Sequence, residues 1–199
     1  MNKVTNSLIH PLDVTTNCKI THIEDLDLKS CRHLTLWYYN PQNHSLDNIP
    51  NIPELETLRI YHSNITTLDN IERFQRLQVL DLQYLPKLEN VDSISSLRYL
   101  DCLYISSSKK IKNIENVLVS MPITDLKICD CGCLPSLNFI TGIPNLKRFS
   151  FAGTKILDGD MTPLLSDCIH LSWCGFDNKK VYSHKSDEIN KILVMRRFE

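Results

Sequence analysis

The sequence has few glycines, five among 199 residues, and lacks any apolar run long enough to cross a bilayer or to form the core of a signal peptide. So few glycines disfavour an enzyme that cradles phosphate groups in glycine-rich loops. The motifs G-x-S-x-G, H-E-x-x-H and the P-loop are also absent. We therefore expect a protein that is made and kept in the cytoplasm and that is not an enzyme.

An excess of charge of either sign is also missing. The chain has 22 Lys and Arg residues against 23 Asp and Glu residues, for a net charge of −1. General binders of nucleic acids or anionic membranes carry a basic excess, so we expect neither kind of partner. The hydrophobic fraction of 42% is enough for one globular unit with a substantial core.

What the sequence does have is an internal repeat of the pattern L-x-x-L-x-L. Its clearest unit, residues 55–74, alternates apolar residues with period two and then spaces them three apart, which predicts a strand followed by a tight helical return. The second apolar residues of successive units lie 20 to 26 residues apart. The second and third apolar residues, which we expect to point inward, are Leu34 and Leu36, Leu58 and Ile60, Leu80 and Leu82, Leu100 and Cys102, Leu126 and Ile128, Phe149 and Phe151, and Leu171 and Trp173.

With this pattern, residues 31–176 resemble the leucine-rich repeat family, whose units have about 20–29 residues. The resemblance implies an α/β solenoid of about seven units, each adding one strand to a parallel sheet on the concave face. We assign residues 1–199 to a single leucine-rich repeat domain. Because the exposed ends of such a stack need covering, residues 1–30 are expected to form an N-terminal cap or a degenerate unit, and residues 177–199 a C-terminal cap with a short helix.

The sequence departs from the family pattern in the turn after each strand, where the family favours Asn or Cys. The corresponding residues here are Tyr39, Ser63, Leu85, Ile105, Cys131, Thr154 and Phe176. Because asparagine is missing from this column, the backbone groups of the turns must be satisfied in another way. We also interpret the 26-residue gap, which contains "SSSKK" at residues 106–110, as a loop that bulges from the edge of the stack.

Eight cysteines raise the question of a metal or redox centre, above all the triplet "CDCGC" at residues 129–133. In a reducing cytosol they are expected to be free thiols. On the repeat, Cys131 and Cys133 fall in buried columns, whereas Cys129 and Cys174 face outward on different strands. These sulfurs do not converge on one zinc ion, whose bonds to sulfur are about 2.3 Å long. We therefore expect small buried hydrophobic residues and no cofactor, and a metal or redox protein is the weakest functional hypothesis.

The side chains beside the inward residues face outward on the concave side, and in the first four units many of them are aromatic. The predicted partner-binding residues there are Trp37, Tyr38, Arg59, Tyr61, His62, Asp81, Tyr84, Tyr99, Asp101 and Tyr104. Large aromatic side chains with a few charges are typical of hot spots in protein interfaces. The alternative is that the tyrosines merely support the sheet, because tyrosine favours strands.

The closing segment "SWCGFDNKKVYSHKSDEINKIL", residues 172–193, carries a more specific resemblance. It is similar to the end of small bacterial leucine-rich repeat proteins encoded beside polymorphic or contact-dependent toxins. Those proteins resemble immunity proteins, which bind and block a cognate toxin domain. The resemblance implies a cytoplasmic toxin inhibitor that is a monomer when free and that acts by occlusion.

Another intracellular function stays open beside this one. The alternative is a leucine-rich repeat adaptor or regulator of another protein, similar to phosphatase regulators. In both hypotheses the partner is a protein. Asp81 and Asp101, predicted on neighbouring strands, form an acidic cluster that would pair with a basic patch on that partner.

Overall fold

The structure is a computed structural model that describes residues 12–166 and 168–196. Residues 1–11, which belong to the predicted N-terminal cap, lie outside the described residues.

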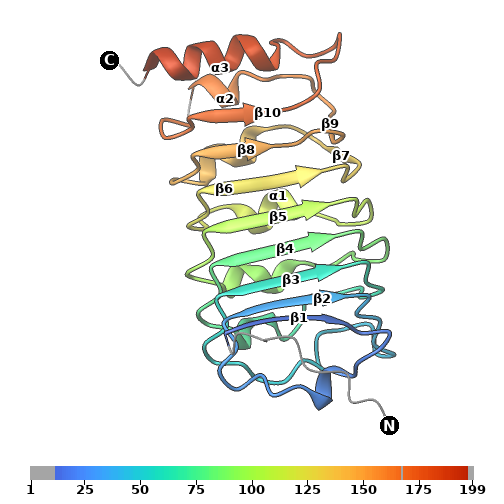
Figure 1. The fold of residues 1–199 in the computed structure, drawn as a ribbon. Coiled ribbons are helices and arrows are strands. Elements are labelled where there is room, and N and C mark those ends of the chain that lie inside the picture. The colour runs from blue at the N-terminus through green and yellow to red at the C-terminus, as the bar shows by residue number, and fades with distance from the viewer. Residues whose placement is uncertain (1–11, 167, 197–199) are drawn as a thin grey trace.

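Eight parallel strands form one large sheet, in which neighbouring strands follow one another in chain order (Figure 1). This order leaves no crossover between distant strands. The strands are β1 (Asp13–Asn17), β2 (His33–Trp37), β3 (Thr57–Tyr61), β4 (Val79–Gln83), β5 (Cys102–Ser106), β6 (Asp125–Cys129), β8 (Arg148–Ser150) and β10 (Trp173–Gly175). A second, two-stranded parallel sheet consists of β7 (Cys133–Leu134) and β9 (Lys155–Ile156).

Short helical segments lie in the returns between the strands and cover one face of the large sheet (Figure 1). They are η1 (Ile23–Asp25), η2 (Ile71–Arg73), η3 (Asp92–Ser96), α1 (Ile114–Leu118), η4 (Asn138–Gly142) and α2 (Pro163–Ser166), followed by α3 (Ser186–Met195) at the end of the chain. Neighbouring returns also contact one another, as η2 does with η3 and α1 with η4. The arrangement is compatible with a repeat-like α/β fold.

The core lies between the sheet and the returns, and it is continuous from one rung to the next. A rung is defined here as one strand of the large sheet with the return that follows it. In β3, Leu58 and Ile60 are fully buried, and Ile71 and Phe74 of the following return are equally buried. Because parallel pairing places Leu58 beside Leu80, equivalent side chains stack in columns, and each rung buries its apolar residues against both neighbours.

Strand β5 begins later than the repeat pattern predicts. Leu80 of β4 pairs with Leu103, so the prediction that Leu100 and Cys102 form the inward pair of this strand is wrong, although Leu100 is buried just before it. The apolar residues of this segment fit the repeat pattern in two ways, one that counts Leu100 and one that counts Leu103 as the second apolar residue. Only the second way keeps β5 in register with both neighbouring strands. Leu80, Leu103 and Leu126 then follow one another at intervals of 23 residues, and the predicted bulging loop is not needed to explain the spacing.

The orientation predicted for β10 is also wrong. Cys174 pairs with Phe149 and is buried, whereas Trp173 is 39% exposed on the opposite face of the strand. The predicted phase placed Trp173 inward and Cys174 outward. Leu171 caused the error, because it is buried but lies before the strand and not within it.

Helix α3 closes this end of the sheet. Its first turn is capped by Glu188, which accepts a hydrogen bond from the backbone amide of Lys185 at 2.9 Å. Asn190 covers the free backbone of β10, because its side chain accepts from the amide of Cys174 at 2.9 Å and donates to the carbonyl of Cys174 at 2.7 Å. A short helix was predicted here, and its buried residues are Ile189 and Leu193.

A column of hydroxyl groups satisfies backbone groups in the turns that follow the strands. Thr154 accepts a hydrogen bond from the amide of Cys131 at 2.9 Å, and Ser108 accepts one from the amide of Leu85 at 3.3 Å. Ser108 occupies the position that the sequence assigned to Ile105, because of the shift in β5. In these two turns serine and threonine thus take the role that asparagine has in the family pattern.

Candidate functional site

The face of the large sheet opposite the returns is called the open face here, and no helix covers it in Figure 1. The first, third and fifth residues of each five-residue strand point to it, because side chains alternate along a strand. On β2 to β6 these residues are His33, Thr35 and Trp37; Thr57, Arg59 and Tyr61; Val79, Asp81 and Gln83; Cys102, Tyr104 and Ser106; and Asp125, Lys127 and Cys129.

Three aromatic residues form a stack immediately after strands β2, β3 and β4. The ring centroids of Tyr38 and His62 are 5.3 Å apart, and those of His62 and Tyr84 are 4.6 Å apart with an interplanar angle of 5°. Lys19 extends the stack at its other end, with its Nζ 3.9 Å from the centroid of Tyr38. We call Tyr38, His62 and Tyr84 the aromatic ladder.

The backbone of the aromatic ladder is left-handed, with φ of 58° at Tyr38, 57° at His62 and 59° at Tyr84. This conformation costs a residue with a side chain about 1 kcal/mol or more. The sheet holds it in place, because the amide of His62 still donates to the carbonyl of Gln83 at 2.9 Å and that of Tyr84 to the carbonyl of Ser106 at 3.1 Å. The backbone that carries each ring is therefore hydrogen-bonded to the next strand.

Two rings on the strands themselves adjoin the ladder. Trp37 and Tyr61, the last residues of β2 and β3, meet edge to face with centroids 4.7 Å apart, and Trp37 lies 6.0 Å from His62. We call Trp37, Tyr38, Tyr61, His62 and Tyr84 the aromatic patch. The structure thus brings together five of the predicted partner-binding residues, over β2 to β4.

Asp81 lies beside this patch and is already bound by protein groups. The residue is only 7% exposed, and its carboxylate accepts hydrogen bonds from the hydroxyl of Tyr61 at 2.8 Å and from the side-chain amide of Gln83 at 3.0 Å. Burial, with the nearby carboxylate of Asp81, raises the pKa of Tyr61 to about 12. Asp81 therefore acts as an internal acceptor and is not a free acidic group.

A hollow of about 370 Å³ lies on the open face next to Asp81 and is called the central hollow. It is lined by Arg59, Asp81, Gln83, Tyr104, Ile105, Ser106, Lys127 and Cys129. Lys127 lies over the ring of Tyr104, with its Nζ 4.3 Å from the centroid. Burial raises the pKa of the Tyr104 phenol, and so do the nearby Cys102 and Asp125, so this hydroxyl keeps its proton at neutral pH.

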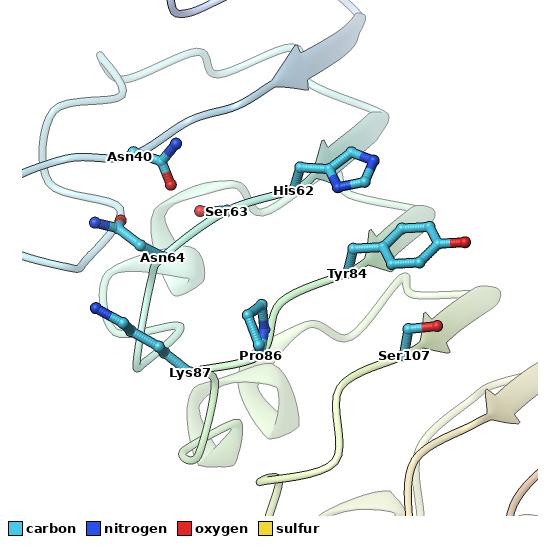
Figure 2. Close-up of a pocket in the computed structure, with 8 residues that line it drawn as sticks. All are labelled: Asn40, His62, Ser63, Asn64, Tyr84, Pro86, Lys87 and Ser107. Atoms are coloured by element: carbon cyan, nitrogen blue, oxygen red, sulfur yellow. The ribbon is translucent and has the colours of Figure 1, made fainter.

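A second hollow of about 410 Å³ lies where the strands end, and Figure 2 shows the residues that line it. They are Asn40, His62, Ser63, Asn64, Tyr84, Pro86, Lys87 and Ser107. The rings of His62 and Tyr84 lie side by side on one side of it, and Asn40, Asn64 and Lys87 lie on the other (Figure 2). The aromatic ladder ends here, because the next residue of its column is Ser107, also left-handed with φ of 52°.

Two of the predicted binding residues lie elsewhere. Tyr99 is 67% exposed but precedes β5, so it is not on the open face. Asp101 also precedes β5, and its carboxylate accepts a hydrogen bond from the hydroxyl of Thr124 at 2.7 Å. The predicted acidic cluster of Asp81 and Asp101 is therefore wrong. The shift in β5 caused both errors, and it places Tyr104 directly opposite Asp81.

Sequence reasoning also missed two residues of the open face. Lys127 was not among the predicted binding residues, and Trp173 was expected to point inward. Arg148 lies over the ring of Trp173, with its Cζ 5.1 Å from the centroid. The signal that identifies Lys127 is its register, since it follows Arg59, Asp81 and Tyr104 in a row across four adjacent strands.

The three cysteines of the "CDCGC" triplet have different surroundings. Cys129 is half-buried on the open face, Cys131 packs against the core, and burial raises its pKa to about 11. Cys133, predicted in a buried column, is exposed, because Leu134 takes the inward position on β7. In residues 12–166 and 168–196, no group of three His, Cys, Asp or Glu side chains is placed to hold a metal ion.

Tyr61→Phe is expected to reduce the loss of stability at alkaline pH. The pKa of Tyr61 is about 12 in the folded protein and 10.0 for a free tyrosine, so the folded state holds this proton more tightly. The contribution to stability is complete below about pH 10 and is lost as the pH rises from about 10 to about 12. The measurement is the free energy of unfolding between about pH 9 and about pH 11. Tyr99→Phe is the control and should follow the wild type, and an equally steep decline in Tyr61→Phe would contradict the assignment.

A scan of the chain against protein-family models gives no match, and a search among curated proteins finds no significant similarity either. None of the helices in the described part of the chain is both long enough and apolar enough to span a bilayer.

Proposed function

We propose that the protein is a leucine-rich repeat protein that binds another protein through the open face of its sheet, which is the concave side of a solenoid. The partner is a toxin domain, and the protein is its cytoplasmic immunity protein. The observation that carries the binding role is the aromatic patch, five contiguous rings of which three stand on left-handed backbone. The toxin as partner rests on the resemblance of residues 172–193.

The fold itself does not require these rings, which supports a binding role for them. The same column of left-handed residues continues as Ser107, Asp130 and Gly153, and the sheet continues through these rungs although none of these three residues is aromatic. Left-handed backbone is easiest for glycine and is also adopted by asparagine and aspartate. Tyrosine at two such positions therefore lowers the stability of the fold, and Tyr84 is 51% exposed. A role in binding explains why tyrosine occupies these positions.

The proposed mechanism is occlusion. A rigid patch of aromatic side chains contributes a large contact area at a low cost in conformational entropy, and such residues commonly dominate binding energy. Docking of the patch over the active site or substrate entrance of a toxin domain would block it, with no bond made or broken. The protein therefore acts in a stoichiometric complex and is a monomer when free.

The test is co-expression with the toxin domain encoded beside the gene. Cells that carry the wild-type protein should survive toxin induction, and the two proteins should elute as one complex in size-exclusion chromatography. Cells that carry Trp37→Ala with Tyr84→Ala should not survive. Lys110→Ala, a change at an exposed lysine outside the open-face positions, is the control and should protect fully. Survival with the double variant would exclude the aromatic patch, and absence of a complex with the toxin domain would favour the adaptor function instead.

A further inference from the structure

We infer that the partner places an acidic side chain in the central hollow, between Arg59 and Lys127. This inference rests on the proposed function and specifies the chemistry of the partner. It reverses the expectation from the sequence, which was an acidic cluster facing a basic partner.

The charges of the central hollow point to an acidic group. Within the described residues, neither Arg59 nor Lys127 has a carboxylate within 4.0 Å of its side-chain nitrogens. Asp81, which pairs with Arg59 in the strand register, already accepts hydrogen bonds from Tyr61 and Gln83. Two cations and one carboxylate line the hollow, so it has a positive excess that an acidic side chain would neutralise.

The geometry of the sheet suits a carboxylate of the partner that approaches the open face. Arg59, Asp81, Tyr104 and Lys127 form one row across β3, β4, β5 and β6. Adjacent strands lie about 4.8 Å apart, so the backbones under the two cations are about 14 Å apart and their long side chains both reach the hollow between them. The hydroxyl of Tyr104 already interacts with Cys102 and Asp125, so the two cations supply the recognition of the carboxylate.

The aromatic patch beside the hollow indicates which partner residues lie next to the partner's acidic residue. Tyr61 contacts Asp81 at the border of the hollow, and Trp37 and His62 lie next to Tyr61 on the other side. A partner segment with an acidic residue in the hollow therefore has apolar or aromatic residues close to it, over the patch. The segment that fits is both acidic and apolar, in contrast to the basic segment expected from the sequence.

The experiment is selection of random dodecapeptides displayed on phage against the immobilised full-length protein. The selected peptides should share an Asp or Glu next to aromatic or large apolar residues. A synthetic peptide of the consensus sequence should bind at least about tenfold more weakly to the variant carrying Arg59→Gln and Lys127→Gln, and its affinity for the wild type should fall as salt is added. Lys110→Gln is the matched control. Circular dichroism and thermal melting check that each variant is folded.

The other outcomes separate the two proposals. A consensus peptide without an acidic residue, lost in Trp37→Ala but unaffected by the change at Arg59 and Lys127, would overturn the inference and leave the binding face intact. Peptides that bind all these variants equally would place the binding surface elsewhere and would count against both proposals. Recovery of basic consensus peptides, or of no peptide that depends on Arg59 and Lys127, would also overturn the inference.

Discussion

Leu80→Ala is expected to lower the free energy of unfolding by about 2–5 kcal/mol. Leu80 is fully buried in β4, where its backbone is paired with Leu58 on one side and Leu103 on the other. Removal of its three outer carbon atoms leaves a cavity that the surrounding rungs can fill only in part, because stacking on both sides fixes their positions.

The measurement is chemical denaturation followed by circular dichroism, with the wild type and Leu157→Ala measured alongside. Leu157 is 55% exposed, so its truncation removes the same atoms without leaving a buried cavity, and stability should change by less than about 0.5 kcal/mol. Equal effects of the two substitutions would mean that Leu80 is not in the core and that the register of β4 is wrong.

Tyr84→Ala and Trp37→Ala are each expected to weaken binding of the partner by about thirtyfold or more, which corresponds to about 2 kcal/mol. Both rings are exposed in the free protein, Tyr84 at 51% and Trp37 at 37%, and both contact His62. Tyr61 is a poorer choice for this test, since its truncation would also remove a hydrogen bond from the buried carboxylate of Asp81.

Isothermal titration calorimetry against the purified partner, which we propose is a toxin domain, measures the loss. Tyr99→Ala is the matched control, because Tyr99 is 67% exposed but lies off the open face, and its affinity should equal that of the wild type. Truncation of Tyr84 should affect folding less than binding, because its ring faces solvent. A loss of affinity for Tyr99→Ala and none for Tyr84→Ala would move the interface to the edge of the sheet.

Much of the sheet could be predicted from the sequence, because the spacing of apolar residues defines both strand position and inward face. The pattern placed Leu58, Leu80 and Leu126 correctly. It failed at β5, where Leu100 and Leu103 both fit the apolar pattern and only pairing with the neighbouring strands distinguishes them. A local pattern has no information about that pairing.

The candidate site was less predictable, since its chemistry depends on which side chains contact one another. The sequence indicated that Asp81 is outward-facing, but not that Tyr61 and Gln83 occupy its carboxylate. It also gave no indication that Tyr38 and Tyr84 stand on left-handed backbone, a conformation usually signalled by glycine or asparagine. These features follow from the stacking of neighbouring rungs.

The order of the strands also determines how the molecule would respond to force. Strand β1 and helix α3 lie at opposite ends of the stack in Figure 1, and the hydrogen bonds between strands are directed along the line that joins those ends. Tension between the two ends therefore loads the strand pairs one after another, and the terminal rung can detach while the others stay folded. Each rung of about 23 residues would release about 80 Å of chain. Under load the protein would therefore unfold rung by rung and lengthen in steps, and the whole domain would not unfold in a single event.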